Sequence, residues 1–354
     1  MKKLMSGSKR MNISIIVLNV CDLGGIERSS FTLAKNLRKA GHNVELVSLY
    51  ENNEVALNST ERYRVLKGSN EFVKLKKYIN TLDESTIIIS AYDRLSFIIS
   101  LIFFFSNRKN KLIAHQHADY FAHSLKVRFL RKIAYKIGCD AIVCLTNVDF
   151  KLYKKWHKKC YIIPNILDTD FITNDIHNDF STRETDFLAG GRLHPIKRFE
   201  DFIKLHDDLT KKNSLSFKLF GHGSDYQRLC NISSSAHKVI QGSTKKMFAE
   251  MQNSKFFIVT SHRESFSMVI VEAMAAGCIV ISYSCPTGPG EIITDGYDGY
   301  LIPDGDYSSL YKKCSELLQN EQKLIQVSEN AKITAQKYWP ENVIKKWDLL
   351  FLNL

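Results

Sequence analysis

The feature that most constrains the fold of this chain is a repeated alternation of short apolar runs with longer amphipathic segments. In the first half, the runs predict strands at Ser14–Asn19, Val44–Leu49, Thr86–Ser90, Lys111–Ala114 and Ala141–Leu145. Each run is followed by enough residues to form a crossover helix. This order predicts a parallel sheet that is covered by helices on both faces.

The pattern restarts after the segment from Tyr161 to Asn165, which we interpret as a last strand that runs into a turn. The second half predicts strands at Phe187–Ala189, Phe217–Phe220, Val239–Ile240, Phe256–Val259 and Ile279–Ser282, and helices at Arg198–Leu209, Thr244–Gln252 and Ser267–Ala276. Because 354 residues are too many for one compact core, we expect two doubly wound α/β domains that face each other across a cleft. The boundary falls between residues 165 and 166, and the polar segment Asn174–Glu184 suits a linker or an exposed loop.

The charge of the chain is unevenly distributed. Lys and Arg outnumber Asp and Glu by 49 to 37, which gives a formal net charge of +12. Residues 1–165 alone carry +15, and residues 166–354 carry −3. A hydrophobic content of 44% is typical of globular proteins and excludes disordered, collagen-like and coiled-coil chains. We therefore expect the first half of the chain to bind a polyanionic partner.

The cysteines and the apolar runs indicate the cellular compartment in which the protein is expected. The eight cysteines lack CxxC spacing, so we interpret them as thiols of a reducing compartment and expect a cytoplasmic protein. The apolar run Ile13–Val20 is interrupted by polar residues and predicts a buried first strand rather than a signal peptide. The longest apolar run, Leu95–Phe105, is shorter than the roughly 20 residues that cross a bilayer. It predicts a buried helix or an interfacial patch.

Two loops that follow predicted strands contain residue types that bind phosphate groups. Gly24 and Gly25 lie between a strand and a helix, where N–H groups and the helix dipole can hold an anion. They lack the GxGxxG pattern, and an ordinary tight turn is the alternative. Arg192 and Lys197 also lie between a strand and a helix. A planar guanidinium and a mobile ammonium suit a diphosphate, and a solvated basic loop is the alternative.

The most informative segment runs from His262 to Gly277. Ser267 is a suitable N-cap and Gly277 a suitable stop for an apolar helix that contains Glu272. A carboxylate in an apolar helix is costly unless it has a partner, so Glu272 is expected to bind hydroxyls or a cation. Glu264 lies in the loop just before this helix. The two carboxylates suit the two ends of one substrate.

These motifs resemble those of retaining glycosyltransferases of family 4, which have the GT-B fold and include enzymes of bacterial surface-polysaccharide synthesis. Glu264 and Glu272 form an E-x7-E pair, preceded by Gly191-Arg192 and Lys197. Other matching segments are Gly24–Ser29, Ile163–Asn165, Gly221–Gly223, Ser284–Ile293 and Trp339–Trp347. The resemblance covers nearly the whole chain. It implies two Rossmann-like domains, an acceptor domain (1–165, with a C-terminal helix at 340–354 packed back on it) and a donor domain (166–339).

The resemblance also implies how a nucleotide-diphosphate sugar would be bound. Gly24 and Gly25 would face the phosphate and the sugar of this donor. Arg192 and Lys197 would neutralise the diphosphate. The helix that starts after Ser267 would add the N–H groups of Met268 and Val269 to the phosphate site.

Three further residues would contact the sugars of the donor. The resemblance places Glu272 on the ribose hydroxyls, Glu264 against the transferred sugar, and His117 near the anomeric centre. A structural role for His117 is one alternative. Metal binding by His115 and His117 is another, although no third ligand has suitable spacing. We place His115 on the opposite side of the extended segment and leave it out of the site.

The sequence also departs from the family pattern or imitates other motifs. Ser265 and Ser267 stand where the family often has glycine. The segments Asp168–Asp170 and Asp304–Asp306 imitate the DxD metal motif of another glycosyltransferase fold, but we interpret both as surface turns. We expect no metal and no other cofactor.

A predicted helix around residues 125–137 offers an explanation for the positive charge of the first half. Its basic side carries Lys126, Arg128, Arg131, Lys132 and Lys136, and its other side carries Leu125, Phe129, Ile133 and Ile137. Beside the apolar run Leu95–Phe105, such a helix suits docking on anionic lipid. An ordinary helix with a charged outer face is the alternative. No nucleic-acid-binding signature is present.

The resemblance implies a retaining glycosyltransferase that moves a hexose or N-acetylhexosamine from a nucleotide-diphosphate sugar to a lipid-linked or polysaccharide acceptor. A UDP-sugar is favoured because the segment Ser284–Ile293 resembles that of members that build bacterial surface polysaccharides, and GDP-mannose is left open as the alternative donor. Its product would belong to a cell-surface glycan such as lipopolysaccharide or capsule. The enzyme would act on the inner face of the cytoplasmic membrane. A GT-B sugar-nucleotide epimerase or phosphorylase, and a non-catalytic membrane-docking subunit, are the alternatives.

Overall fold

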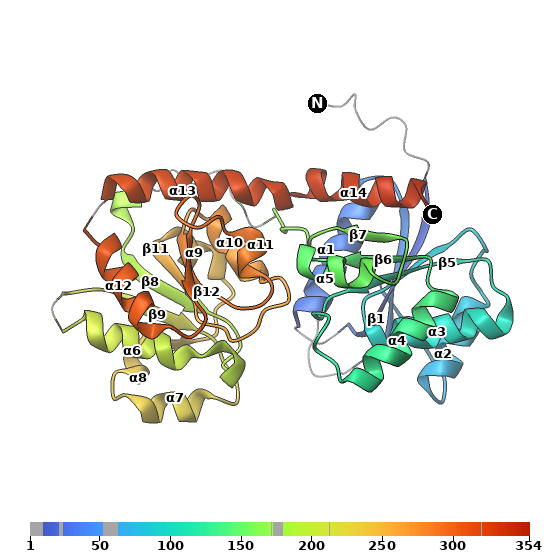
Figure 1. The fold of residues 1–354 in the computed structure, drawn as a ribbon, viewed down its shortest axis with the longest axis horizontal. Helices are drawn as coiled ribbons and strands as arrows, with labels where there is room; N and C mark the ends of the chain where they lie inside the picture. Colours follow the sequence, from blue (N-terminus) through green and yellow to red (C-terminus); the bar gives the residue numbers. More distant parts are fainter. Residues whose placement is uncertain are drawn as a thin grey trace. The chain divides into compact units, whose positions relative to one another are not determined.

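The computed structural model describes residues 10–20, 24–51, 63–170, 172, 180–211, 213–319 and 321–354 (Figure 1). The chain divides into two compact units. Unit 1 contains Met1–Ile166 and Pro340–Leu354, and unit 2 contains Leu167–Trp339.

Unit 1 is built on a parallel sheet. Within its described residues the strand order is β3-β2-β1-β4-β5-β6-β7. The strands are β1 (Asn12–Asn19), β2 (Asn43–Tyr50), β3 (Tyr63–Val65), β4 (Ile87–Ser90), β5 (Lys111–Gln116), β6 (Ala141–Cys144) and β7 (Cys160–Ile162). The helices are α1 (Gly25–Lys39), α2 (Glu71–Ile79), α3 (Asp93–Ser106), α4 (Leu125–Gly138), α5 (Asn147–Lys154) and α14 (Pro340–Leu352).

Two apolar cores cover the two faces of this sheet. Ile13, Ile15 and Val17 of β1 belong to one core, and Ile16 belongs to the other, as the alternation of side chains along a strand requires. Helix α14 belongs to the first core, where Trp347 is only 1% exposed. The last residues of the chain are therefore part of unit 1.

Unit 2 repeats the architecture with a sheet in the order β10-β9-β8-β11-β12-β13, again parallel throughout its described strands. The strands are β8 (Thr185–Gly190), β9 (Phe217–Phe220), β10 (Ile240–Gly242), β11 (Ser254–Val259), β12 (Ile279–Ser284) and β13 (Tyr300–Pro303). The helices are α6 (Phe199–Leu209), α7 (Tyr226–Ile232), α8 (Ala236–Val239), α9 (Met247–Gln252), α10 (Met268–Ala275), α11 (Pro289–Ile292), α12 (Tyr307–Leu317) and α13 (Glu321–Ala335).

The strand order fixes where a ligand site belongs in each unit. In unit 1 the order reverses between β1 and β4, and in unit 2 it reverses between β8 and β11. Open α/β sheets bind ligands outside the carboxyl ends of the strands at such a reversal. A ligand site is therefore expected beside the carboxyl ends of β1, β8 and β11.

The prediction of two doubly wound α/β domains is confirmed, and it missed two short edge strands. Tyr63–Val65 and Tyr300–Pro303 form β3 and β13. Each is only three or four residues long, which is too short for the alternation of side chains to stand out in the sequence. The expected linker Asn174–Glu184 lies mostly outside the described residues.

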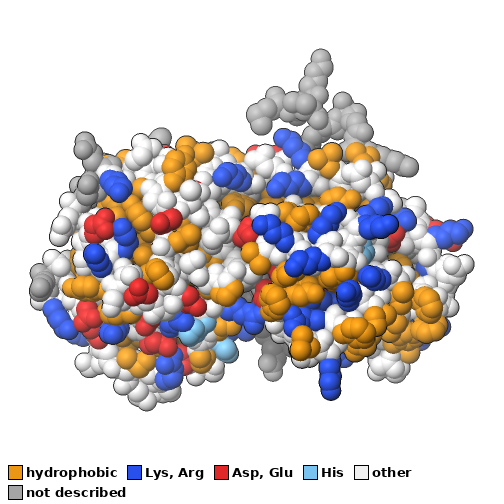
Figure 2. Space-filling view, viewed as in Figure 1, with side chains coloured by type: hydrophobic (Ala, Val, Ile, Leu, Met, Phe, Trp, Pro, Cys, Tyr) orange, Lys and Arg blue, Asp and Glu red, His pale blue; other side chains and the backbone are white. Residues whose placement is uncertain are grey.

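Helix α4 is oriented differently from the prediction. Its buried residues are Arg131, Ala134 and Tyr135. Arg131 is only 2% exposed, so its assignment to a solvated basic side is wrong. The apolar residues of the other side, such as Leu125 (75% exposed) and Phe129 (64%), face solvent instead of the core. Figure 2 shows hydrophobic side chains at the surface in this part of the molecule. The alternative of an ordinary helix with a charged outer face is also wrong, because such a helix would bury its apolar side.

Among the described residues, no helix has the combined length and apolar character needed to cross a membrane. The seven cysteines in this part of the chain are free and buried.

Candidate active site

An ion pair lies where the strand order of unit 2 reverses. Lys197 ends a short turn after β8, and Glu264 lies in the loop after β11. The Lys197 Nζ is 2.6 Å from Glu264 Oε1, and the two side chains are 24% and 10% exposed. The Ser261 hydroxyl donates to the same oxygen at 2.7 Å. The expected diphosphate cation and the expected sugar-binding carboxylate are thus in direct contact.

Backbone contacts hold the loops after β8 and β11 together. The Thr260 hydroxyl donates to the carbonyl oxygen of Lys197 at 2.7 Å. The His262 N–H donates to the carbonyl oxygen of Ile196 at 2.8 Å. The Lys197–Glu264 pair is therefore positioned by the chain on both sides and not only by its own charges.

The Gly-His-Gly motif explains how the loop after β9 joins this arrangement. A Cβ atom on Gly221 would lie 2.0 Å from the carbonyl oxygen of Gly191, so no side chain fits there. The Leu193 N–H donates to the His222 carbonyl at 2.9 Å. The loop that carries Arg192 is therefore packed directly on the next loop, and Arg192 itself is exposed at the surface.

Ser267 is the N-cap residue of α10, as predicted, but its conformation is not that of an ordinary cap. Ser267 has a φ of 74°, in the left-handed region, and its side chain makes no capping hydrogen bond. Its hydroxyl is buried without a hydrogen-bond partner among the described residues. The hydroxyl therefore does not bind the first N–H groups of α10, as a capping serine would. The family's frequent glycine at this position fits the same backbone requirement.

The first turn of α10 retains its anion-binding character. Met268 and Val269 carry two of the first N–H groups, which have no partner inside a helix. The helix dipole adds partial positive charge at this end. Glu272 lies four residues after Met268, on the same side of the helix, and is half-buried. The predicted donor residues of α10 thus share one end of the helix.

The segment after β12 supports the loop that carries Glu264. The Thr287 hydroxyl donates to the backbone carbonyl of Glu264. Gly288 has a φ of 89°, and a Cβ atom there would lie 3.0 Å from the Cβ of Glu264. The Pro-Thr-Gly-Pro motif therefore allows a close approach of two loops, which explains why the sequence has glycine at this point.

Arg198 is a residue near the site that the sequence analysis did not single out. Its Nε donates to His262 Nε2 at 3.0 Å, its Nη1 pairs with Asp304 at 3.0 Å, and its guanidinium stacks on Tyr283. The only sequence signal was its position next to Lys197. Asp306 accepts a capping hydrogen bond from the Ser309 N–H at the start of α12. The segment Asp304–Asp306 therefore has structural partners for both of its carboxylates.

In unit 1, a carboxylate already lies at the start of α1. Glu27, in the first turn of α1, is 4% exposed and accepts a hydrogen bond from the Tyr92 hydroxyl. A Cβ atom on Gly24 would lie 2.4 Å from Glu27 Oε2, whereas one on Gly25 would meet nothing within 4 Å. Negative charge against Gly24 disfavours a phosphate there. A buried carboxylate at this turn suits hydroxyl groups instead.

The two histidines at the end of β5 lie together. The rings of His115 and His117 are 4.1 Å apart between centroids. Residues two positions apart in an extended segment share a side, so placing His115 on the opposite side was wrong. Both Nε2 atoms are buried without a hydrogen-bond partner among the described residues. Burial lowers the pKa of His117 to about 4 and that of His115 well below its usual value.

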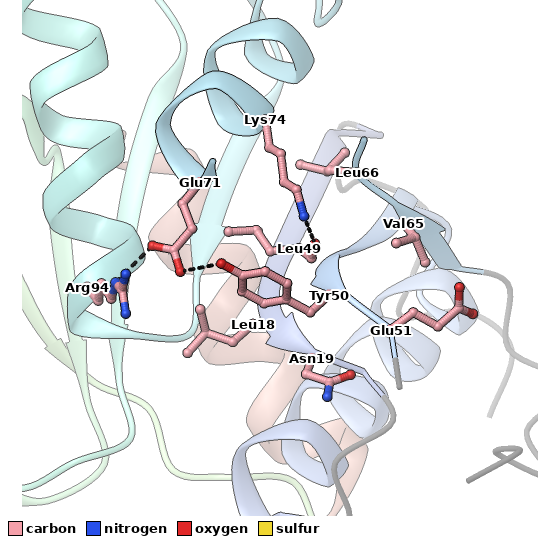
Figure 3. Close-up of a pocket in the computed structure, with 10 residues that line it drawn as sticks. All are labelled: Leu18, Asn19, Leu49, Tyr50, Glu51, Val65, Leu66, Glu71, Lys74 and Arg94. Atoms are coloured by element: carbon pink, nitrogen blue, oxygen red, sulfur yellow. Dashed lines mark hydrogen bonds and ion pairs between the residues drawn. The ribbon is translucent and has the colours of Figure 1, made fainter. Parts of the chain in front are cut away.

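A polar hollow of about 650 Å³ lies at the carboxyl ends of β1 and β2 (Figure 3). The Tyr50 hydroxyl donates to Glu71 Oε1 at 2.9 Å, and Arg94 Nε lies 2.8 Å from Glu71 Oε2. Lys74 lies over the Tyr50 ring at 4.4 Å. An aromatic ring beside paired charges suits the apolar faces and the hydroxyls of a sugar.

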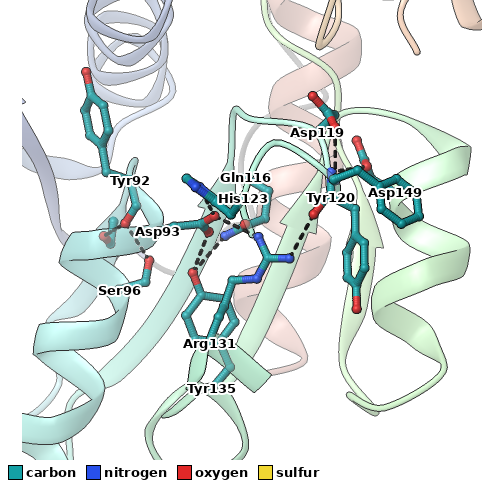
Figure 4. Close-up of polar contacts among 12 residues, drawn as sticks. Tyr92, Asp93, Ser96, Gln116, Asp119, Tyr120, His123, Arg131, Tyr135 and Asp149 are labelled. Atoms are coloured by element: carbon teal, nitrogen blue, oxygen red, sulfur yellow. Dashed lines mark hydrogen bonds and ion pairs between the residues drawn. The ribbon is translucent and has the colours of Figure 1, made fainter. Parts of the chain in front are cut away.

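Beneath α4, Arg131 organises a buried polar network (Figure 4). It pairs with Asp93 at 2.7 Å and donates to the Tyr120 carbonyl at 3.2 Å. The Tyr135 hydroxyl and His123 also bind Asp93, at 2.8 and 3.0 Å. Burial by itself would raise the pKa of Asp93, but these partners outweigh it and hold that pKa below its usual range. The network joins α3, α4 and the loop that follows His117.

Among the described residues, no group of three or more His, Cys, Asp and Glu side chains is arranged to hold a metal ion. Positive charge at the site of unit 2 comes from Lys197, Arg192 and the start of α10. Together with Glu264 and Glu272, these groups can bind a molecule that has a diphosphate at its centre and hydroxyls at its ends.

Comparison with solved structures identifies the architecture. The Anabaena protein HepE, solved in complex with UDP, matches 97% of this chain and 100% of its own at a TM-score of 0.79 and 16% identity. This likeness concerns the fold, which is that of the GT-B glycosyltransferases.

Family models and curated relatives then define the protein more closely. Residues 23–171 match the model "Glycosyltransferase Family 4", and residues 171–334 match "Glycosyl transferases group 1". A Campylobacter jejuni α-1,4-N-acetyl-D-galactosaminyltransferase is 27% identical over 95% of this chain and 97% of its own. The amylovoran biosynthesis glycosyltransferase AmsD of Erwinia amylovora is 26% identical over 94% and 97%. This chain belongs to glycosyltransferase family 4 and is a glycosyltransferase.

Proposed function

We propose that this protein is a retaining glycosyltransferase that transfers a hexose or N-acetylhexosamine from a UDP-sugar to a lipid-linked or polysaccharide acceptor. The observation that carries the proposal is the convergence of Lys197, Glu264 and the start of α10 at the point where the strand order of unit 2 reverses. The product would contribute to a cell-surface glycan such as lipopolysaccharide or capsule. The enzyme would act on the inner face of the cytoplasmic membrane.

In the proposed reaction, the bond between C1 of the sugar and the β-phosphate oxygen breaks as an acceptor hydroxyl approaches from the same face. The new glycosidic bond forms on that face, and the hydroxyl proton passes to the departing phosphate oxygen. Lys197, Arg192 and the N–H groups of Met268 and Val269 stabilise the charge that develops on the diphosphate. No metal ion is required, because these groups supply the positive charge.

The carboxylates and His117 have separate proposed roles. Glu272 binds the ribose hydroxyls, and Glu264 accepts hydrogen bonds from the transferred sugar while its contact with Lys197 keeps both groups in place. His117 is neutral at physiological pH because its pKa is about 4. It therefore contributes a hydrogen bond near C1 rather than a positive charge. Its buried and unpartnered Nε2 supports contact with a ligand.

The proposed substrates draw on similar proteins. HepE was solved with UDP and with UDP-glucose, which supports a UDP-sugar donor. The Campylobacter relative is named for transfer onto a glycan on undecaprenyl diphosphate, and the Erwinia relative for amylovoran biosynthesis. These names support a lipid-linked or polysaccharide acceptor. The hollow beside Tyr50 in unit 1 is our proposed place for its terminal sugar.

A donor screen tests the proposal. UDP-, GDP- and ADP-sugars are compared by thermal shift, and a true donor stabilises the protein by about 2.7 kcal/mol at a hundred times its dissociation constant. We expect stabilisation by a UDP-sugar without added metal and in the presence of a chelator. Stabilisation by GDP-sugars alone would contradict the choice of donor.

Product analysis then separates the possible activities. With donor and acceptor glycolipid, we expect UDP and a new α-linkage from an α-linked donor, identified by NMR. Conversion of the nucleotide sugar without acceptor would favour an epimerase. Release of a sugar phosphate when phosphate is added would favour a phosphorylase. Donor binding with neither transfer nor hydrolysis would favour a non-catalytic subunit.

A further inference from the structure

Helix α4 exposes the side that an ordinary helix of an α/β protein buries. Its buried positions form a stripe of Arg131, Ala134 and Tyr135. Arg131 and Tyr135 both bind the Asp93 carboxylate. Its large apolar residues are between 43% and 75% exposed: Leu125, Val127, Phe129, Leu130, Ile133 and Ile137. Such a helix has an unpartnered apolar face.

Neighbouring aromatic residues extend this face. Helix α3 packs closely along α4, since a Cβ atom on Gly138 would lie 2.5 Å from the Ser100 carbonyl oxygen. At the end of α3, Phe104 and Phe105 are 60% and 76% exposed, and Phe121 before α4 is 58% exposed. We call these three residues and the exposed apolar residues of α4 the α3–α4 surface. Figure 2 shows hydrophobic side chains gathered over these two helices.

Basic side chains lie among the apolar residues. Helix α4 carries Lys126, Arg128, Lys132 and Lys136 in addition to the buried Arg131. No Asp or Glu occurs anywhere between Tyr120 and Cys139. Lys and Arg can bury their carbon stems beside apolar groups while their charges reach outward. An apolar face interleaved with cations is typical of helices that lie in the interface of an anionic membrane.

We propose that the α3–α4 surface docks on an anionic lipid bilayer, with α4 lying in the plane of the interface. This inference rests on the proposed function to the extent that a lipid-linked acceptor gives docking its purpose. Charge argues against a second copy as the occupant. A symmetric contact would place the same basic helix on both sides, and no acidic residue on α4 would balance it.

The fixed orientation of α4 supports the proposal. The Arg131–Asp93 pair, with Tyr135 and His123 on the same carboxylate, holds the basic and apolar residues outward. Arg131 also binds the Tyr120 carbonyl, in the loop that begins at His117. The docking face is therefore connected by direct contacts to the segment that carries the proposed catalytic histidine.

Vesicle co-sedimentation of the full chain tests the docking surface. Vesicles of phosphatidylcholine with phosphatidylglycerol are compared with vesicles of phosphatidylcholine alone. We expect Phe129→Ser/Leu130→Ser to lower the partition coefficient on the anionic vesicles at least tenfold. Lys132→Ser/Lys136→Ser should lower it by roughly fivefold per cation removed and remove most of the difference between the two vesicle types. Binding should weaken as salt rises.

Exposed apolar residues elsewhere provide the matched control. Ile333→Ser/Leu349→Ser removes side chains that are 58% and 60% exposed on α13 and α14, and it should bind vesicles like the parent. Equal binding by all variants, or binding that ignores anionic lipid, would overturn the proposal. A dimer that dissociates in Phe129→Ser/Leu130→Ser, together with no vesicle binding, would assign the surface to a second copy instead.

The failure of docking is distinguishable from the failure of the proposed function. Stabilisation by UDP and slow hydrolysis of a UDP-sugar are measured without vesicles in the same variants, and both should match the parent. Vesicle binding without any interaction with UDP-sugars would leave docking in place and contradict the donor assignment. Hydrolysis of a UDP-sugar without vesicle binding would leave the donor assignment in place and contradict docking.

Discussion

Substitution of a single residue, Lys197, tests the proposed donor site. We expect Lys197→Ala to lower turnover by about 10²–10³-fold, as the loss of one group that stabilises a developing anion does. Lys255→Ala is the matched control, since Lys255 is also half-buried (28%) and paired with a carboxylate, Asp186, in unit 2. Steady-state kinetics with a UDP-sugar measure the effect. Turnover of Lys197→Ala close to that of the control would contradict a role on the leaving group.

The two buried histidines predict a loss of stability in acid. An unfolded histidine has a pKa near 6.5, whereas that of His117 is about 4 in the folded chain. Between these values the unfolded state binds more protons, so stability falls as the pH falls. His117 should account for about 2 kcal/mol of the unfolding free energy between pH 7 and pH 5. Above pH 7 its effect is absent.

Urea denaturation at both pH values measures this prediction. His117→Asn should lose less stability than the parent on acidification, whereas His157→Asn, at the half-exposed His157, should follow the parent. An unchanged acid response in His117→Asn would show that His117 is not held neutral by burial.

Among the elements, α4 depends on a buried ion pair where most helices depend on an apolar stripe. Arg131→Met leaves the Asp93 carboxylate, only 12% exposed, without its cation. We expect the free energy of unfolding to fall by about 3–5 kcal/mol. Replacing both partners, in Asp93→Asn/Arg131→Met, should recover part of this loss because no charge then remains buried.

An exposed ion pair in the same unit serves as the control for the buried Arg131–Asp93 pair. Arg64 pairs with Glu45 at 2.8 Å, and its side chain is 54% exposed. Arg64→Met should cost less than about 1 kcal/mol. Chemical denaturation of the three variants gives the comparison. A double variant no more stable than Arg131→Met would mean that Arg131 contributes through packing alone.

The elements also show how far the sequence could predict the structure. The strands of both sheet centres were predictable because each is a short, mainly apolar run such as Ile87–Ser90. The orientation of α4 was missed because a helical pattern tells which residues share a side and not which side is covered. The stripe of Arg131, Ala134 and Tyr135 was the signal, since small and aromatic residues recur there at helical spacing.

Some properties of the site residues were likewise predictable from the sequence, and others were not. Lys197 and Glu264 were predictable because each follows a strand beside the point where the strand order reverses. The left-handed backbone of Ser267 depends on how the loop packs, which the sequence alone does not encode for a serine. The neighbourhood of His115 and His117 was predictable from the period of two along a strand. Their lack of partners was not, because it depends on burial by distant residues such as Trp347, whose ring centroid is 5.2 Å from His115.

In the whole molecule, the chain leaves unit 1 at Ile166 and returns to it at Pro340. Unit 1 therefore completes its core only with the last residues of the chain, whereas unit 2 has a core of its own. The two cores are separate, and the residues that we propose to bind the diphosphate lie in unit 2. We therefore expect a substitution in the core of unit 1 and a bound donor to affect different unfolding transitions.

Trp347→Ala should destabilise unit 1 by about 3–5 kcal/mol, because a large side chain that is 1% exposed leaves a cavity. Leu349→Ser is the control on the same helix, since Leu349 is 60% exposed and its loss should change little. Differential scanning calorimetry with and without UDP measures both effects. We expect Trp347→Ala to lower one transition and UDP to raise the other. If UDP raises the transition that Trp347→Ala lowers and leaves the second unchanged, the donor binds mainly to unit 1, and the assignment of the diphosphate to Lys197 and α10 fails.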